Sequence, residues 1–195
     1  RFEKTKQAAD GVAIEMVIDR SSSMYAHDFT IDGKAVDRLT AVRKVAGDFI
    51  NGMGSLHGRS SDLIGLVTFA GYADSNCPMT FDHEFLVTDV LNSIRIVNER
   101  AEDGTAIGDA LALAVERLAS LDERVKSESG NTIQSKVIIL LTDGENNQGD
   151  SDCMGLRGAV LQLFLSDAAV GPTFFMKLVC AHGFQRLLSQ LRKNV

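Results

Sequence analysis

Two short runs of apolar, mostly β-branched residues each end abruptly in a loop that carries an aspartate. The first run covers residues 12–18 and is followed by Asp19. The second covers residues 137–141 and is followed by Thr142 and Asp143. Continuous apolar runs of this length are typical of strands buried on both faces, as in a parallel sheet. The pattern therefore favours a covered sheet with acidic loops at its strand ends.

The segments between these runs have helical and further strand patterns. Apolar residues spaced by three and four predict one helix over residues 39–53, ended by glycines 52 and 54, and another over residues 107–121. Further strands are predicted at 63–70 and 79–88, a short helix at 90–96 and a loop at 122–135.

Strands that alternate with helices predict right-handed crossovers between parallel strands. The predicted fold class is therefore α/β, with a doubly wound, mainly parallel sheet and helices on both faces. The chain has 195 residues, 45% of them apolar, which suits one core and a single domain over residues 1–195. Ligands of such sheets bind outside the carboxyl ends of the strands, where both aspartate loops are expected.

The charge of the chain is uneven. The formal net charge is −6, but residues 1–150 contribute −9 and residues 151–195 contribute +3. An acidic chain without a basic stripe is not expected to bind nucleic acid. The apolar runs of the central strands are far shorter than the roughly 20 residues of a membrane helix, so we expect no membrane contact.

The cysteines do not indicate a disulfide framework or a zinc site. Cys77, Cys153 and Cys180 are odd in number and form no paired motif. We interpret them as buried free thiols.

Five oxygen-bearing side chains form the candidate site. Asp19, Ser21 and Ser23 alternate in one loop, so a tight turn can aim all three oxygens into one pocket. Thr105 lies at a predicted helix start, and Asp143 ends the strand expected beside the first. Hard oxygen donors with few carboxylates suit Mg²⁺, with Mn²⁺ or Ca²⁺ as alternatives. The two carboxylates balance the charge of the ion, which stays electrophilic enough to accept a carboxylate from a partner.

Each piece of this pattern also has an ordinary structural interpretation. The Asp19-to-Ser23 string can be a turn that caps the next element, Thr105 a helix cap, and Asp143 with Gly144 a turn after a strand. The metal site is favoured because all three pieces fall at the same end of one predicted sheet.

Other functional classes fit less well. A phosphotransferase of the haloacid dehalogenase type needs a second aspartate two positions after the first, where Ser21 stands. The glycine-rich motifs of nucleotide-binding enzymes do not occur. Two alternatives stay open: a structural interaction module with a vestigial metal site, and a Mg²⁺-dependent phosphotransferase or hydrolase.

The order of these motifs resembles the metal-ion-dependent adhesion site of von Willebrand factor type A domains, over about residues 10–150. The strings around Asp19, Thr105 and Asp143 are similar to those of bacterial aerotolerance proteins of the Bat type. The resemblance implies a Rossmann-like sheet with one antiparallel edge strand, no catalysis, and Mg²⁺-assisted binding of an Asp or Glu carboxylate of a partner protein. It implies an extracytoplasmic domain of a membrane-anchored protein, so we expect the chain, which opens at Arg1 without a signal region, to be an excerpt.

Within this resemblance, each site residue has an expected role. Ser21, Ser23 and Thr105 are expected to bind the metal directly, and Asp19 and Asp143 directly or through water. Residues of the surrounding loops are expected to shape partner choice: Tyr25, His27, Glu145 and Asn146.

Two features depart from the family pattern. Ser22 stands where many relatives have glycine. Residues 151–195 fit the family in length but not in sequence, with a helix predicted at 156–165, a strand at 173–179 and a helix carrying Phe184 and Leu191. We hypothesise that this tail is strongly diverged or comes from an altered reading frame, which comparison of the encoding DNA in all three frames would test.

Overall fold

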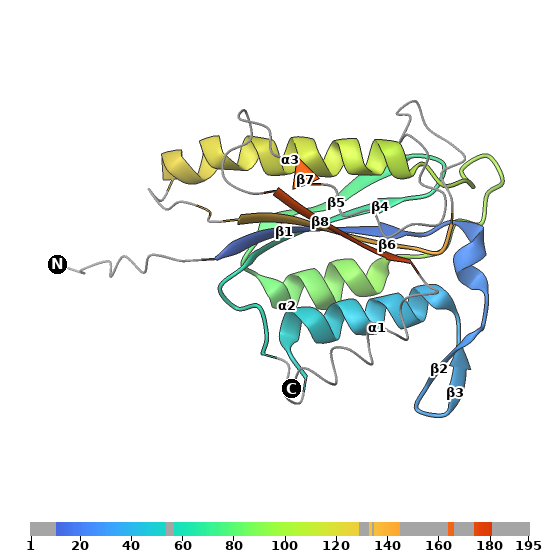
Figure 1. The fold of residues 1–195 in the computed structure, drawn as a ribbon. Helices are drawn as coiled ribbons and strands as arrows, with labels where there is room; N and C mark the ends of the chain where they lie inside the picture. Colours follow the sequence, from blue (N-terminus) through green and yellow to red (C-terminus); the bar gives the residue numbers. More distant parts are fainter. Residues whose placement is uncertain are drawn as a thin grey trace.

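The computed structural model describes residues 11–53, 57–128, 133, 135–144, 164–165 and 174–180. Its main feature is a six-stranded sheet with the order β5-β4-β1-β6-β8-β7 (Figure 1). The strands are β1 (Val12–Asp19), β4 (Leu63–Phe69), β5 (Ala73–Thr80), β6 (Ser135–Thr142), β7 (Phe164–Leu165) and β8 (Phe174–Cys180). The four strands β4, β1, β6 and β8 run parallel, while β5 and β7 lie antiparallel at the two edges.

The first strand forms the centre of the described sheet. β1 pairs with β4 on one side and with β6 on the other, and Asp19 lies opposite Phe69 at its end. All of its residues after Val12 are buried. A strand covered on both faces needs apolar side chains at odd and even positions alike, which explains the continuous apolar run.

Helices cover both faces of this sheet (Figure 1). On one face lies α3 (Ile107–Glu128), against the odd-numbered positions of β1 and the even-numbered positions of β6. On the other lie α1 (Arg38–Asn51) and three short helical turns, α2 (His83–Phe85), η2 (Leu86–Val90) and η3 (Leu91–Ser93). Two apolar clusters therefore form, one on each side of the sheet.

The start of α1 is defined by its cap. The Asp37 carboxylate accepts hydrogen bonds from the Thr40 backbone N–H at 2.7 Å and from the Thr40 hydroxyl at 2.8 Å. These bonds satisfy helix donors that would otherwise lack a partner. They hold the pKa of Asp37 below its ordinary value, against the opposing effect of burial. Arg38 is therefore placed at the first position of the helix.

A hairpin precedes this helix. β2 (Phe29–Ile31) and β3 (Lys34–Val36) pair antiparallel through Asp32 and Gly33, which have φ angles of 50° and 77°. Two consecutive positive φ angles are typical of the tight turn that matches strand twist. Each of its strands has only three residues, too few to leave a strand pattern in the sequence.

Most of the predicted elements are confirmed, with some bounds shifted. The helices over 39–53 and 107–121 and the strands at 63–70 and 137–141 correspond to α1, α3, β4 and β6. The strand predicted at 79–88 is wrong: β5 ends at Thr80, and helical turns begin at His83. The helix predicted at 90–96 accordingly lies earlier, over residues 83–93. The loop predicted at 122–135 is wrong over 122–128, where α3 continues to Glu128, and at Ser135, where β6 begins.

The tail joins the same sheet where it is described. β8 corresponds to the strand predicted at 173–179 and pairs parallel with β6. The helix predicted at 156–165 is wrong at residues 164–165, which form β7 beside β8. The rest of that helix, and the one predicted from Phe184 to Leu191, lie outside the described residues. Among the helices that are described, none is long and apolar enough to cross a membrane.

Candidate metal centre

The loop after β1 brings three of the predicted site residues together. The buried carboxylate of Asp19 accepts a hydrogen bond from the backbone N–H of Ser21 at 2.8 Å. The next residues form a short 3-10 helix, η1 (Ser22–Tyr25), whose turn places the hydroxyl oxygens of Ser21 and Ser23 2.9 Å apart. The alternation Asp19, Ser21, Ser23 therefore directs its oxygens to one place, as the sequence predicted.

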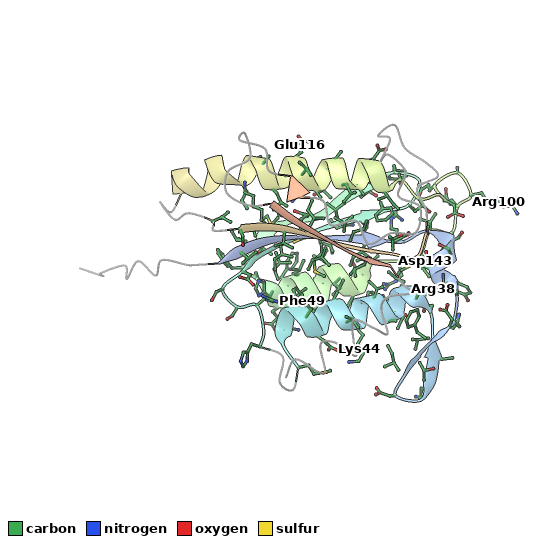
Figure 2. All side chains as sticks on the ribbon, in the orientation of Figure 1. Arg38, Lys44, Phe49, Arg100, Glu116 and Asp143 are labelled. Atoms are coloured by element: carbon green, nitrogen blue, oxygen red, sulfur yellow. The ribbon has the colours of Figure 1, made fainter. Side chains whose placement is uncertain are left out.

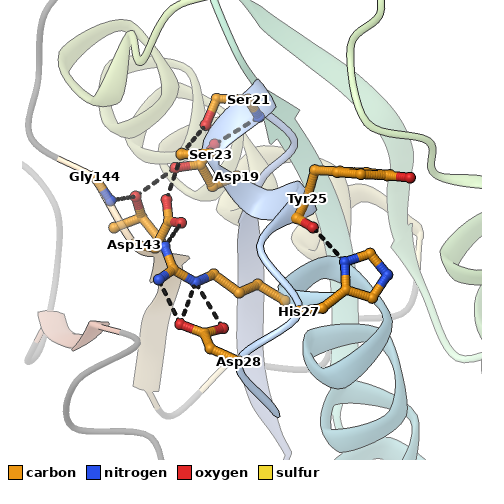
Figure 3. A network of polar contacts seen from close by, with 10 residues as sticks. Asp19, Ser21, Ser23, Tyr25, His27, Asp28, Asp143 and Gly144 are labelled. Atoms are coloured by element: carbon orange, nitrogen blue, oxygen red, sulfur yellow. Dashed lines mark hydrogen bonds and ion pairs between the residues drawn. The ribbon is translucent and has the colours of Figure 1, made fainter. Parts of the chain in front are cut away.

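The end of β6 completes this cluster (Figure 3). The Ser23 hydroxyl donates a hydrogen bond to Oδ1 of Asp143 at 2.8 Å. The Thr142 hydroxyl donates to Oδ2 of Asp19 at 2.5 Å and accepts from the backbone N–H of Gly144 at 3.1 Å. Because β1 and β6 are parallel neighbours, their ends meet at one edge and their aspartates become neighbours in space.

Thr105 lies beside the same cluster. A Cβ atom placed on Gly144 would lie 3.4 Å from the Thr105 hydroxyl oxygen and 3.9 Å from Oδ2 of Asp19. The side chains of Thr105 and Asp19 therefore both border the space beside the Cα atom of Gly144. Thr105 is buried and precedes the first turn of α3. All five predicted residues thus lie at the carboxyl edge of the sheet, four in direct contact and the fifth adjacent.

Backbone hydrogen bonds hold the three loops of this edge against one another. The N–H of Arg20 donates to the carbonyl of Phe69 at 2.8 Å, and the N–H of Ala106 donates to the carbonyl of Ala70 at 2.7 Å. Gly71 donates to the carbonyl of Glu102 at 2.8 Å. The loops after β1 and β4 and the loop before α3 are therefore connected through the backbone.

Ser22 connects two of these loops through its side chain. Its hydroxyl donates to Oδ2 of Asp103 at 2.6 Å, and its backbone N–H donates to Oδ1 at 2.9 Å. These bonds hold the pKa of the Asp103 carboxyl below its ordinary value. The departure from glycine at this position thus adds a hydrogen bond between the loop of Ser21 and Ser23 and the loop of Thr105.

Burial dominates the electrostatics of Asp19. It raises the pKa of Asp19 to about 6, although hydrogen bonds from Thr142 and Ser21 act in the opposite direction. The nearby charge of Asp143 raises the pKa further. Two carboxylates held so close in a buried site favour a positive charge between or beside them.

An arginine meets the second carboxylate. Nη1 of Arg38 donates to Oδ2 of Asp143, while Nε and Nη2 of the same guanidinium contact the Asp28 carboxylate. Figure 2 shows Arg38 and Asp143 at the same end of the sheet. The two carboxylates hold the pKa of Arg38 above its ordinary value. Asp143 therefore has a hydroxyl on one oxygen and a guanidinium on the other.

An aromatic residue stands at the rim. Tyr25 is 66% exposed, and its ring meets that of His27 edge to face with the centroids 5.1 Å apart. Nδ1 of His27 donates to the Tyr25 carbonyl at 2.8 Å (Figure 3). Glu145 and Asn146, the other two predicted rim residues, lie outside the described residues.

The donor chemistry of the cluster fits a hard divalent cation. It offers three hydroxyl oxygens and two carboxylates, the ligand types that Mg²⁺ and Mn²⁺ take in proteins. In the described ranges, this cluster included, no group of three or more His, Cys, Asp or Glu side chains could hold a metal, so a cation here would depend on the hydroxyl oxygens. Cys77 is buried and free, while Cys153 lies outside those ranges, as does the side chain of Cys180.

Four residues of this neighbourhood were missed from the sequence: Thr142, Arg38, Asp28 and Asp103. Thr142 could have been found, since it directly precedes Asp143 at a strand end. The other three have no local signal, because their partners lie 10 to 105 positions away along the chain.

Comparisons with known proteins agree on one family. The family model described as von Willebrand factor type A domain matches residues 14–163. An aerotolerance-related membrane protein from Bacteroides fragilis, crystallised with multiple mutations to serines, is 29% identical with a TM-score of 0.52, and the match covers 71% of this chain and 57% of that one. BatB from Bacteroides thetaiotaomicron, a conserved hypothetical protein, is 28% identical with a TM-score of 0.51 and the same coverage.

A membrane-spanning protein from Vibrio fischeri is 34% identical with a TM-score of 0.46, and the match covers 72% of this chain and 61% of that one. The chain thus spans less than two thirds of the length of these three relatives. No curated protein matches it.

Proposed function

Because the chain belongs to the von Willebrand factor type A domain family, we propose that it binds a partner protein through a divalent cation at the carboxyl edge of its sheet. Domains of this family are often protein-interaction modules. The cation we propose is Mg²⁺, with Mn²⁺ or Ca²⁺ as alternatives. Its proposed ligands are Asp19, Ser21, Ser23, Thr105 and Asp143, the aspartates directly or through water.

One observation carries this proposal: hydroxyl and carboxylate oxygens from two strand ends and a helix start meet around one point. The Ser23 hydroxyl donates its hydrogen bond to Asp143 and accepts one from Ser21, so one of its lone pairs stays available to a cation. Asp19 receives its hydrogen bonds from Thr142 and the Ser21 backbone, which fix its orientation. A bound cation would supply an open coordination position to an Asp or Glu carboxylate of the partner.

The chain's own residues would then select that partner. The exposed ring of Tyr25, which contacts His27 edge to face, offers an apolar surface on the same loop as Ser21 and Ser23. Tyrosine is enriched in protein interfaces because it buries a large area with few rotatable bonds. We propose binding rather than catalysis, because domains of this family are often protein-interaction modules.

A metal titration tests this proposal. Thermal unfolding of the 195-residue chain is followed in EDTA and in millimolar Mg²⁺. At ten times its dissociation constant, the ion should stabilise the folded state by about 1.4 kcal/mol and raise Tm by roughly 3–5 °C. Asp19→Asn should abolish this shift, whereas Asp48→Asn, which removes an aspartate on the exposed face of α1, should keep it.

Other results would favour the alternatives. No shift in the wild-type chain at millimolar Mg²⁺ or Mn²⁺ would support a module with a vestigial site. Mg²⁺-dependent hydrolysis of a generic phosphate ester, lost in Asp19→Asn, would support an enzyme. A pull-down from native extract with and without EDTA would then identify a partner whose capture needs the metal.

A further inference from the structure

Three charged side chains, Asp143, Arg38 and Asp28, form a row that runs from the candidate metal site to the protein surface. The side chain of Asp143 is only 1% exposed, that of Arg38 is 21% exposed and that of Asp28 is 49% exposed. Nη1 of Arg38 donates to Asp143, and Nε lies 3.0 Å from both carboxylate oxygens of Asp28. Nη2 lies 2.5 Å from Oδ2 of Asp28. The guanidinium is therefore held from both sides.

This row divides the two oxygens of Asp143. Oδ1 accepts from the Ser23 hydroxyl, which belongs to the candidate ligand set, and Oδ2 accepts from the guanidinium. Arg38 thus occupies the oxygen that Ser23 does not use. Its position at the first turn of α1 is fixed by the cap at Asp37 and by its backbone N–H, which donates to the carbonyl of Ala26 at 3.1 Å.

The negative charges of the two carboxylates, Asp19 and Asp143, are compensated by different groups. Among the described residues, Asp19 accepts hydrogen bonds from neutral donors, the Thr142 hydroxyl and Ser21. Asp143 has a full positive charge in contact. A buried carboxylate needs such compensation, and a divalent cation would supply the same compensation to both. The same guanidinium charge would also repel a cation bound nearby, because like charges in a partly buried site are poorly screened.

Resting on the proposed function, we propose that Arg38 is a positioning residue that serves as the built-in counter-cation of the metal site. It neutralises Asp143 and keeps it aimed at the Ser23 hydroxyl when no divalent ion is bound. Its charge, partly balanced by Asp28, lowers the affinity of the site for the metal. Metal affinity is therefore set by the Arg38–Asp28 ion pair, neither member of which is one of the five proposed ligands.

The test uses two variants that alter this ion pair from opposite sides. Arg38→Met removes the repelling charge and keeps the length of the side chain. Asp28→Asn leaves the charge of Arg38 without its surface partner. Binding of Mn²⁺ to the whole chain is measured from the resonance signal of the free ion, and Mg²⁺ by competition. We expect Arg38→Met to bind roughly tenfold more tightly and Asp28→Asn to bind several-fold more weakly, since a nearby like charge costs affinity.

A purely structural role for the row gives a different result. If the three side chains only brace the loops, both variants should weaken metal binding together. Weaker or unchanged binding in Arg38→Met therefore overturns the proposal. Arg38→Lys retains the charge and should keep wild-type affinity within a few-fold. Arg43→Met is the matched control, because it removes an arginine of the same helix that contacts the carbonyls of Asn92 and Ile94 instead.

Folding is checked separately by thermal unfolding in EDTA. Arg38→Met should lower the Tm of the metal-free chain, because it leaves the buried Asp143 without its cation. If that variant does not fold, Asp28→Asn still decides, since unchanged or tighter binding in it contradicts the proposal. If the wild-type chain binds neither ion, the proposed function itself is wrong. If the wild-type chain binds the metal but the affinities of Arg38→Met and Asp28→Asn do not change in opposite directions, only the proposed role of Arg38 is wrong.

Discussion

At the scale of single residues, two glycines differ in the space available for a side chain. Gly71 lies against the loop that precedes α3: a Cβ atom there would be 2.8 Å from the carbonyl oxygen of Glu102, closer than such atoms approach in proteins. Gly47 lies inside α1, where a Cβ atom would be 3.5 Å from Cγ1 of Val87, an ordinary contact. One position excludes a side chain and the other accepts it.

We predict that Gly71→Ala lowers the free energy of unfolding by about 1–3 kcal/mol, because backbone must move to admit the methyl group. The displaced segment is three residues from Thr105, so metal affinity should fall as well. Gly47→Ala is the matched control and should stabilise the chain by about 0.5–1 kcal/mol through helix propensity. Urea unfolding measures both, and a Gly71→Ala chain of unchanged stability would contradict the close packing of this loop.

At the scale of elements, the site depends on how loops of different strands are joined. The bond from the Ser22 hydroxyl to Asp103 links η1 to the loop before α3, across 81 positions of the sequence. The loop of β6 is joined to β1 by the bond from Thr142 to Asp19. These side-chain bonds add to the backbone bonds that hold the edge together.

We predict that Ser22→Ala weakens Mg²⁺ binding several-fold and lowers the free energy of unfolding by about 0.5–1 kcal/mol, since one hydrogen bond to a charged but exposed acceptor is lost. Ser93→Ala is the control. It also removes a hydroxyl, but one that bonds locally to the carbonyl of Val90. Equal metal affinity in Ser22→Ala and the wild-type chain would show that the link does not position the loops.

At the scale of the whole molecule, the sheet meets the α3 layer at one buried charge. Glu15 lies in the middle of β1 and is fully buried, with Oε2 3.5 Å from Nε of Arg117 on α3. Among the described residues, neither of its carboxylate oxygens has a hydrogen-bond partner. Burial raises the pKa of Glu15 to about 7, although the charge of Arg117 acts in the opposite direction.

This pKa predicts how stability depends on pH. In the unfolded chain Glu15 titrates near its ordinary value of 4.5, so between pH 4.5 and 7 the folded state binds more protons than the unfolded state. The contribution of Glu15 to stability is therefore fully present below pH 4.5 and is lost as the pH rises to about 7. Its slope is at most about 1.4 kcal/mol per pH unit.

Urea unfolding in EDTA between pH 4.5 and 8 measures this dependence. Glu15→Gln cannot ionise, so it should reduce the slope in that window, leaving the part that Asp19 contributes below about pH 6. Glu116→Gln removes a neighbouring acid on α3 and should leave the slope as it is. The same slope in Glu15→Gln and the wild-type chain would show that Glu15 is ionised throughout.

The sequence predicts some elements well and others badly, for physical reasons. α1 and β6 were found because strong periodicity or a continuous apolar run marks them. β5 was misplaced because it is an edge strand with exposed residues such as Ser75 and Asn76, so burial leaves little pattern on it. The end of α3 was missed because a polar composition alone does not distinguish a helical turn from a loop.

For the site, the sequence by itself determined which five oxygen-bearing side chains lie together and the edge of the sheet at which they lie; their role as metal donors stays a prediction. This was possible because a strand end is a local feature and parallel neighbours place their ends together. Only the tertiary structure decided what surrounds those donors: Thr142 on Asp19, Asp103 on Ser22, and Arg38 with Asp28 beside Asp143. These contacts join positions 10 to 123 residues apart and follow no periodic pattern, so they are defined only when the chain folds.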